Sequence, residues 1–312
     1  MAALDDILET TAAERLATGF GFTEGPSWHP DGFYYFVDIR KSLLYRLRPD
    51  GTPEVVRSET GEGNGTTFDL EGRLVICEGA NRRVTRMAAD GSIAVLMDRY
   101  QGRRINRPND VVCKSDGSIW FTDPGMRIPL AEKELAYSGV YRVDPDGTKH
   151  LVAEFELPNG LAFSPDERVL YVANTRQAQY IHAIEFDSAG TMLRRRIFAD
   201  MSSEETDGVP DGMKVDVLGR VYCTGPGGTW VFGPDGRRIG IIRTPENPAN
   251  LAFGGPDLTD IFITTAGKSD AIPEMPPGYD PHSGYFGGAL YHINLGIPGR
   301  REYQASIQLV PA

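Results

Sequence analysis

The stretch ELPNGLAFSPDERVLYVANT, residues 156–175, sets the pattern for the whole chain. It holds two short apolar runs, at 161–163 and 169–172, separated by the turn sequence Ser164-Pro165-Asp166. Such runs, bounded by turn residues, predict two β-strands joined by a tight turn. Asn159-Gly160 comes directly before the first run, and Asn before Gly is itself a common turn sequence. Other copies of the stretch decide whether Asn159 does more than make a turn.

Six stretches of the chain follow this pattern, the last of them weakly. We call the first residue of each copy its anchor; the anchors are Glu24, Asn64, Asn109, Asn159, Asp211 and Ala249. Consecutive anchors are 40, 45, 50, 52 and 38 residues apart. A second β-like run follows each copy, at 34–38, 74–78, 119–123, 170–174, 221–224 and 261–265. A repeat of about 40–50 residues with about four strands is typical of a β-propeller blade.

The six copies predict an all-β fold, a six-bladed propeller. Residues 14–20 resemble the strand that precedes the other anchors, so we expect them to supply the outer strand of the sixth blade. Pairing of the two chain ends in this way would leave no free sheet edge at the closure. We expect residues 1–312 to form a single domain.

The anchors are mostly oxygen-bearing side chains. The first strand of a propeller blade lines the central channel, so the anchors should surround one end of the axis. Asn and Asp are also frequent in turns, and each anchor taken alone has that simpler explanation. Five polar anchors in one register favour a shared site, because crowded carboxylates repel unless a proton or a cation lies between them. With no His or Cys at an anchor, the donors favour calcium, then magnesium or manganese, with zinc also open.

The composition limits the class of protein. The formal net charge of the 312 residues is −11, which argues against nucleic acid and anionic membrane surfaces as partners. No apolar run approaches the roughly 18 residues of a membrane span, and the acidic N-terminus lacks a secretory signal pattern. Cys77, Cys113 and Cys223 are widely spaced, which fits a reducing compartment. These features predict a cytoplasmic protein and leave its oligomeric state open.

Four segments resemble one known family. They are FTEGPSW around Glu24, NRPNDVVCKSDGSIWFTDPG around Asn109, LPNGLAFSPDERVLYVANT around Asn159 and VPDGMKVDVLGRVYCTG around Asp211. Together they are similar to the gluconolactonase, senescence marker protein (regucalcin) and luciferin-regenerating enzyme family, over roughly residues 14–295. The segment NGTTFDLEGRLVICEGANRRVTR is closer to the bacterial gluconolactonase-like branch.

The resemblance implies a six-bladed propeller with one divalent metal in the axial channel. The positions that match its metal ligands are Glu24, Asn159 and Asp211. Asn109 matches an asparagine that contacts metal or substrate. Arg107 matches an arginine that binds substrate oxygens in some members, although the Pro108 that follows it here is not shared by all of them. Asn64 has no firm role in the family and is expected to lie behind the ligands.

The activity that the family implies is hydrolysis of a small lactone, either a sugar lactone or a related aliphatic lactone, to the hydroxy acid. A divalent cation would polarise the lactone carbonyl and stabilise the oxyanion. The resemblance makes Asp211 the acceptor of the water proton, and hydroxide on the metal is the alternative base. Asp110 and Asp123 are candidates for contacts behind the ligands, or else ordinary turn and strand-end residues.

Two connections, 124–139 in blade three and 266–288 in blade six, are long for a compact fold. Loops of this kind tend to be lids or binding loops, so they are expected to frame the substrate mouth. Their side chains indicate a partly apolar pocket, or equally a packed rim; they are Met126, Ile128, Leu130, Tyr137, Met275, Tyr279, Tyr285 and Phe286.

Three other functions stay open on this scaffold. A hydrolase for phosphoester or phosphofluoridate bonds would use the same kind of metal-bearing channel. A non-catalytic calcium-binding propeller would need a closed metal shell without an open position. A condensing enzyme similar to strictosidine synthase would need a catalytic glutamate in a later blade, where Ala249 leaves the sixth anchor without a polar group.

Overall fold

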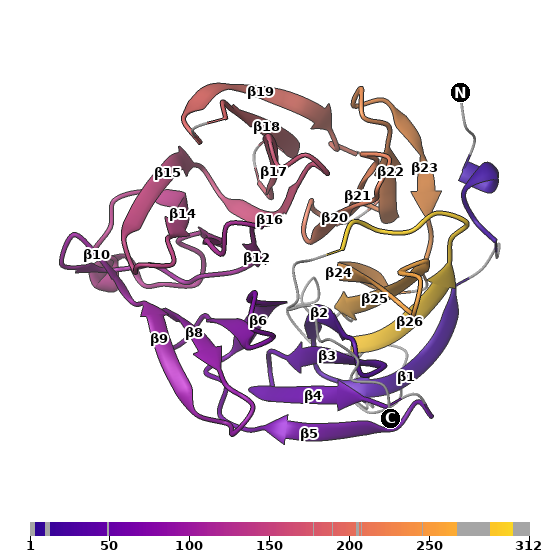
Figure 1. The fold of residues 1–312 in the computed structure, drawn as a ribbon, viewed down its shortest axis with the longest axis horizontal. Coiled ribbons are helices and arrows are strands. Elements are labelled where there is room, and N and C mark those ends of the chain that lie inside the picture. Colours follow the sequence, from indigo (N-terminus) through magenta and orange to yellow (C-terminus); the bar gives the residue numbers. More distant parts are fainter. Residues whose placement is uncertain are drawn as a thin grey trace.

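The strands of the molecule form a closed ring of sheets. The computed structural model describes residues 4–9, 13–48, 50–176, 178–188, 190–203, 206, 208–244, 246–266 and 288–301. Within these residues there are six four-stranded antiparallel sheets around one axis and a separate two-stranded ribbon (Figure 1). The six-bladed propeller predicted from the repeats is confirmed. No helix in the described part of the chain is long and apolar enough to cross a membrane.

Blades one to three are each built outward from the axis. Blade one contains β2 (Thr23–His29), β3 (Phe33–Asp38), β4 (Leu43–Leu47) and β5 (Pro53–Arg57). Blade two contains β6 (Gly63–Phe68), β7 (Leu74–Glu78), β8 (Arg83–Met87) and β9 (Ile93–Met97). Blade three contains β12 (Val111–Cys113), β13 (Ile119–Asp123), β14 (Ser138–Val143) and β15 (Lys149–Phe155). The ribbon of β10 (Arg99–Tyr100) and β11 (Arg103–Arg104) connects blades two and three, and the 3₁₀ turn η2 (Leu130–Glu132) lies between β13 and β14.

Blades four to six repeat the arrangement. Blade four contains β16 (Pro158–Phe163), β17 (Val169–Asn174), β18 (Tyr180–Phe186) and β19 (Met192–Asp200). Blade five contains β20 (Met213–Val215), β21 (Val221–Gly225), β22 (Gly228–Phe232) and β23 (Arg238–Ile242). Blade six contains β24 (Asn247–Gly254), β25 (Asp260–Ala266), β26 (Gly288–Asn294) and, from the other end of the chain, β1 (Glu14–Phe20). A short 3₁₀ turn, η1 (Leu4–Asp6), precedes β1.

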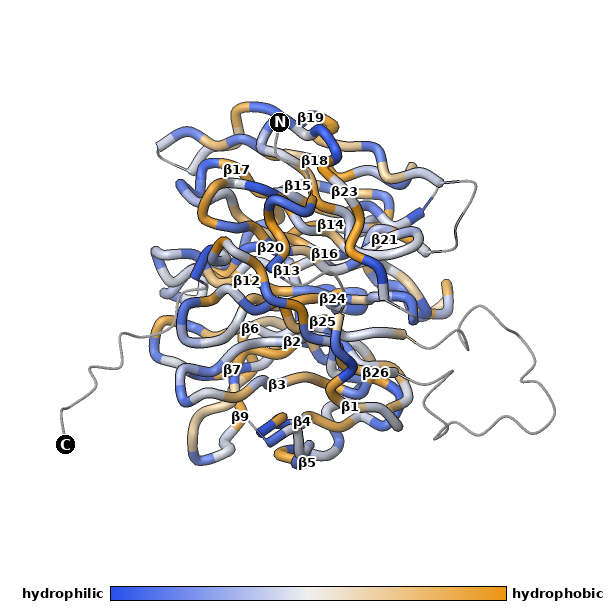
Figure 2. Tube along the Cα trace, turned by 90° about the vertical axis from the view of Figure 1, so that its right-hand side faces the viewer, coloured by the Kyte–Doolittle hydropathy of each residue, from blue (hydrophilic) through white to orange (hydrophobic). Residues whose placement is uncertain are grey.

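The hydrophobic core is divided into layers between neighbouring blades. Every described residue of β7 and β13 is buried, whereas most of β5 and β19 is exposed at the outer edge. The buried apolar residues form six clusters, and within the described residues each cluster joins one pair of adjacent blades. Figure 2 shows the corresponding pattern, with apolar and polar residues alternating along the chain throughout the ring. Because each blade packs on two others, closure of the ring buries apolar faces that an open ring would leave exposed.

The closure joins the two ends of the chain. β1 pairs antiparallel with β26, with Glu14 opposite His292 and Phe20 opposite Gly288, which confirms the prediction for residues 14–20. Arg15 connects β1 to blade six. Its Nε donates to the Tyr291 hydroxyl at 2.8 Å, and its guanidinium pairs with Glu246 at 2.8 Å. Glu246 is 3% exposed and also accepts a hydrogen bond from Tyr291.

Replacement of Arg15 tests the contribution of this closure. In Arg15→Leu the buried Glu246 carboxylate loses its cationic partner, so the free energy of unfolding should fall by about 1–3 kcal/mol. Urea unfolding measures the change. Arg48→Leu is the matched control, because Arg48 pairs with Glu54 at an exposed position, where such a pair contributes less than about 1 kcal/mol. Equal losses in the two variants would contradict a special role for the closure.

Candidate metal-binding active site

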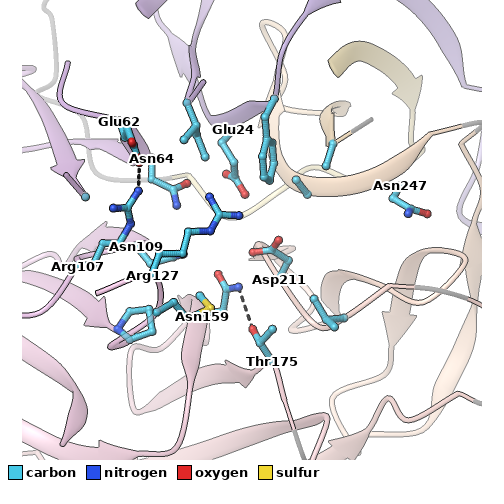
Figure 3. Close-up of a pocket in the computed structure, with 18 of the residues that line it drawn as sticks. Glu24, Glu62, Asn64, Arg107, Asn109, Arg127, Asn159, Thr175, Asp211 and Asn247 are labelled. Carbon is cyan, nitrogen blue, oxygen red and sulfur yellow. Dashed lines mark hydrogen bonds and ion pairs between the residues drawn. The ribbon is translucent and has the colours of Figure 1, made fainter. Parts of the chain in front are cut away.

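The anchors meet around a cavity at one end of the axis. Its volume is ≈ 410 Å³, and all six anchors line it: Glu24, Asn64, Asn109, Asn159, Asp211 and Ala249. Each anchor lies at the start of the first strand of its blade or just before it, as the repeats predict. Figure 3 shows side chains from several blades pointing into this space. The sequence therefore identified the ring of anchors within the lining, in which Ala249 is the apolar anchor.

The Asn159 amide has a fixed orientation. Its Nδ2 donates to Thr175 Oγ1 at 2.9 Å, and the Thr175 hydroxyl donates in turn to the Pro210 carbonyl at 2.9 Å. Thr175 directly follows β17, so the position of the amide is set by blade four itself. Asn159 Oδ1 is buried and has no hydrogen-bond partner among the described residues. A buried amide oxygen without a donor is costly unless a ligand satisfies it.

A second amide oxygen in the cavity, Asn64 Oδ1, is also buried without a hydrogen-bond partner among the described residues. Figure 3 shows the Asn64 amide near Glu24, on the same side of the cavity as Arg107. Asn64 therefore belongs to the lining of the site rather than to a layer behind it, which differs from the role expected from the sequence.

Glu24 and Asp211 place two carboxylates in the same space. Burial, and then the charge of Asp110, raise the pKa of Glu24 to about 7. Burial, and then the charges of Glu24 and Asp110, raise the pKa of Asp211 well above its usual range, and hydrogen bonding with Asn159 partly offsets this rise. The protein therefore holds carboxyl groups close together in a poorly solvated place, an arrangement that favours a bound cation.

The donor set fits a hard divalent cation. Among the described residues, no group of three or more His, Cys, Asp or Glu side chains is placed to hold a metal ion. Two carboxylates alone are too few ligands for such an ion, and the asparagine side chains that line the same cavity add further oxygen donors. This set is compatible with calcium and disfavours metals that prefer sulfur or imidazole.

The sixth blade contributes a residue that the sequence reading missed. Asn250 follows the anchor Ala249, and its Nδ2 donates to Glu24 Oε2 at 2.9 Å, while its Oδ1 accepts from the Leu251 N–H at 2.8 Å. The Gly25 N–H also donates to Glu24 Oε2, at 2.7 Å. Both hydrogen bonds are made to Glu24 Oε2, so Oε1 is the oxygen that remains available to bind a cation.

A sequence signal for Asn250 was present in the repeats. The residue after the anchor is glycine in blades one, two, four and five, but Asp110 in blade three and Asn250 in blade six. In the structure both side chains are buried. Asp110 lies close enough to Glu24 and Asp211 to raise the pKa of both carboxyls. The two exceptions to glycine therefore place polar groups at the base of the site.

Arg107 forms part of the cavity wall, and Asp123 holds the backbone next to it. Asp123 is fully buried, and its Oδ2 accepts from the Asn106 N–H at 2.7 Å, so it holds the backbone just before Arg107. Burial raises the pKa of Asp123 to about 7. Arg107 lines the cavity and forms an ion pair with Glu62. Asp123 therefore supports the segment that carries Arg107 and Asn109.

The loop of blade three lies at the mouth. Pro124, Met126 and Arg127 line the cavity, so the segment 124–139 contributes to the mouth as expected. Its other apolar side chains do not: Leu130 is 88% exposed, and Tyr137 packs against the cluster between blades two and three. From the segment 266–288, only Ala266 and Gly288 belong to the described residues, and Ala266 lines the cavity. The expectation for the rest of that segment lies outside the described residues.

Fold and site together define a class of protein, a six-bladed propeller with an oxygen-lined cavity on its axis. Residues 22–267 match the family model described as SMP-30/Gluconolactonase/LRE-like region. The chain belongs to this family, as the four sequence motifs indicated.

Relatives with known names cover most of the chain. A gluconolactonase of Zymomonas mobilis is 32% identical over 291 residues, which are 84% of this chain and 82% of the relative. A pentonolactonase of Haloferax volcanii is 32% identical over 310 residues, 96% of this chain and 99% of the relative. The solved structure of a gluconolactonase from Xanthomonas campestris superposes with a TM-score of 0.81 at 35% identity, covering 94% of this chain and 92% of that one.

Asn250 can be tested as a residue that positions Glu24. Asn250→Ala should weaken divalent-metal binding by about 10–100-fold, because loss of such an outer contact lets a ligand turn away from the ion. Isothermal titration calorimetry measures the affinity. Asn294→Ala is the matched control, because the Asn294 amide binds Asp260 away from the cavity. Unchanged metal affinity in Asn250→Ala would show that Glu24 does not depend on this contact.

Proposed function

We propose that this protein is a metal-dependent lactonase that hydrolyses a small lactone to its hydroxy acid. The observation that carries the proposal is the cavity, in which the carboxylates of buried Glu24 and half-buried Asp211 lie with amide oxygens that have no hydrogen-bond partner among the described residues. The names of the lactonases that share about a third of its sequence support the substrate class. We also propose that residues 1–312 act as one domain.

The proposed metal ligands are Glu24, Asn159 and Asp211, with Asn109 as a further ligand or a substrate contact. Their oxygens suit calcium first, and magnesium, manganese or zinc after it. When bound, the cation would polarise the lactone carbonyl and stabilise negative charge on its oxygen. Thr175 and Asn250 would keep the Asn159 and Glu24 oxygens directed at the cavity.

The other residues bind and orient the substrate. Arg107, on the wall of the cavity, would donate hydrogen bonds to substrate oxygens, with Glu62 holding its guanidinium in place. Asp211 would accept the proton of the attacking water. Its carboxylate lies in the same cavity as Arg107, where a bound substrate and the attacking water would meet both side chains.

The activity is tested on a panel of substrates. Protein stripped of metal by a chelator should hydrolyse no lactone faster than a blank, and added calcium, magnesium, manganese or zinc should restore hydrolysis to different degrees. Neutral and carboxylate-bearing sugar lactones, aliphatic lactones and a phosphotriester are assayed side by side by proton release. Turnover of the phosphotriester alone would assign the site to phosphoester chemistry. Metal binding without turnover of any substrate would make the protein a binding propeller.

The role of Asp211 is tested by Asp211→Asn, which keeps an oxygen but loses most of the basicity. We expect kcat for lactone hydrolysis to fall by about 10²–10⁴-fold at saturating metal, the usual contribution of a general base. Elemental analysis checks that the variant still holds its metal. Asp235→Asn, at an exposed turn, is the control. Recovery of most of the activity at full metal occupancy would place the base elsewhere and leave Asp211 as a ligand.

A further inference from the structure

The loop between β13 and β14 directs a cationic side chain into the cavity. Arg127 is one of the lining residues. In Figure 3 its guanidinium points toward the centre of the ring of anchors, where Glu24, Asn64 and Asp211 also point. Burial raises the pKa of Asp211 and the charge of Arg127 offsets part of this rise, while burial and then the charge of Arg127 lower the pKa of Arg107. Arg127 is therefore a solvent-exposed residue of the cavity lining whose guanidinium is directed toward the proposed metal ligands.

The backbone of this loop sets the direction of the side chain. Arg127 has φ 56°, in the left-handed region that residues other than glycine adopt rarely. The segment just before this residue is held in place, since the Met126 N–H donates to the Pro124 carbonyl at 2.7 Å and the Gly125 N–H donates to Ser138 Oγ at 3.1 Å. The strained conformation is thus supported by its surroundings.

Arg127 differs from Arg107 in its bonding. Arg107 has a carboxylate partner in Glu62. In the described ranges, Arg127 makes no hydrogen bond and no ion pair within 4.0 Å, although it faces a cavity that contains carboxylates. A guanidinium has only donors, arranged as a planar fork that matches the two oxygens of a carboxylate.

The carboxylates of the cavity are not suitable permanent partners for Arg127. Glu24 and Asp211 are the proposed ligands of a divalent cation, and Glu62 is paired with Arg107. A guanidinium directed toward a cation-binding site instead suits an anion brought by the substrate. A neutral sugar lactone presents hydroxyl groups, which form weaker hydrogen bonds with arginine than a carboxylate does.

We propose that Arg127 selects lactones that carry a carboxylate, bound by its guanidinium while the lactone carbonyl lies at the anchors. This inference rests on the proposed lactonase function and adds the substrate class to it. The preferred substrates are then lactones of dicarboxylic sugar acids rather than of aldonic acids.

The test compares two substrates that differ only at the position in question. Glucono-1,4-lactone ends in a hydroxymethyl group and glucaro-1,4-lactone in a carboxylate. We expect Arg127→Gln to lower the ratio of kcat/KM for the carboxylate lactone to that for the neutral lactone by about 10–100-fold, the usual effect of a hydrogen bond to a charged group. Arg127→Lys should give an intermediate ratio, because it keeps the charge and loses the fork.

The control is Arg103→Gln, which removes an exposed arginine that does not line the cavity and should leave the ratio unchanged. A ratio that stays within about twofold in Arg127→Gln overturns the proposal. If, with that unchanged ratio, Arg127→Gln binds the metal more tightly in calorimetry, Arg127 is instead an internal counter-ion of the carboxylates.

A binding measurement separates this proposal from the lactonase proposal. Calorimetry with metal-loaded protein and the ring-opened acids, glucarate and gluconate, needs no turnover. Tighter binding of glucarate by the wild type, reduced at least about 10-fold in Arg127→Gln, supports the carboxylate site even if no lactone is hydrolysed. Equal affinities for the two acids in the wild type would overturn it even if lactones are hydrolysed.

Discussion

The close contact of neighbouring blades at the axis is the constraint on which the site depends. The Gly65 N–H donates to the Asn109 carbonyl at 2.7 Å, and the Gly160 N–H to the Asp211 carbonyl at 3.2 Å. A Cβ on Gly160 would lie 2.2 Å from the Asp211 carbonyl oxygen. Only glycine lets the backbones approach so closely, and the side chains of successive anchors converge because of it.

This convergence explains both the electrostatics and the chemistry of the site. Crowding at the axis withdraws Glu24 and Asp211 from water and brings Asp110 near them, so that their carboxyls resist ionisation. This crowding of carboxylates does not stabilise the fold, because the negative charges repel each other until a cation or a proton lies between them. The layers of apolar residues between the blades supply the stability that allows it.

The fold could be predicted from the sequence because six copies of one pattern identify an architecture that a single copy leaves ambiguous. One copy of the opening stretch is only a strand, a turn and a strand, but six copies in register imply six blades and a common end of the axis. The closing strand was predictable for the same reason. Asn250 could not be predicted from the anchor position, where Ala249 is apolar, although the glycine pattern is broken one residue later.

The loop residues were less predictable. Met126 and Leu130 belong to the same loop and have similar character, yet one lines the cavity and the other is 88% exposed. Arg127 was not singled out, since the direction of its side chain depends on a left-handed backbone conformation that no sequence period reports. The orientation of the Asn159 amide likewise depends on Thr175, a contact across a turn rather than a motif.

The pairing of β1 with β26 also determines when the protein can finish folding. Glu14 lies opposite His292, so β1 finds its partner only after the strands of the other five blades have been made. Until then the two ends of the ring expose unpaired strand edges and uncovered apolar faces, which are prone to aggregate. Contacts between such distant residues also make folding slow. During synthesis, the opening of the ring is therefore the place where the unfinished propeller is most exposed to aggregation.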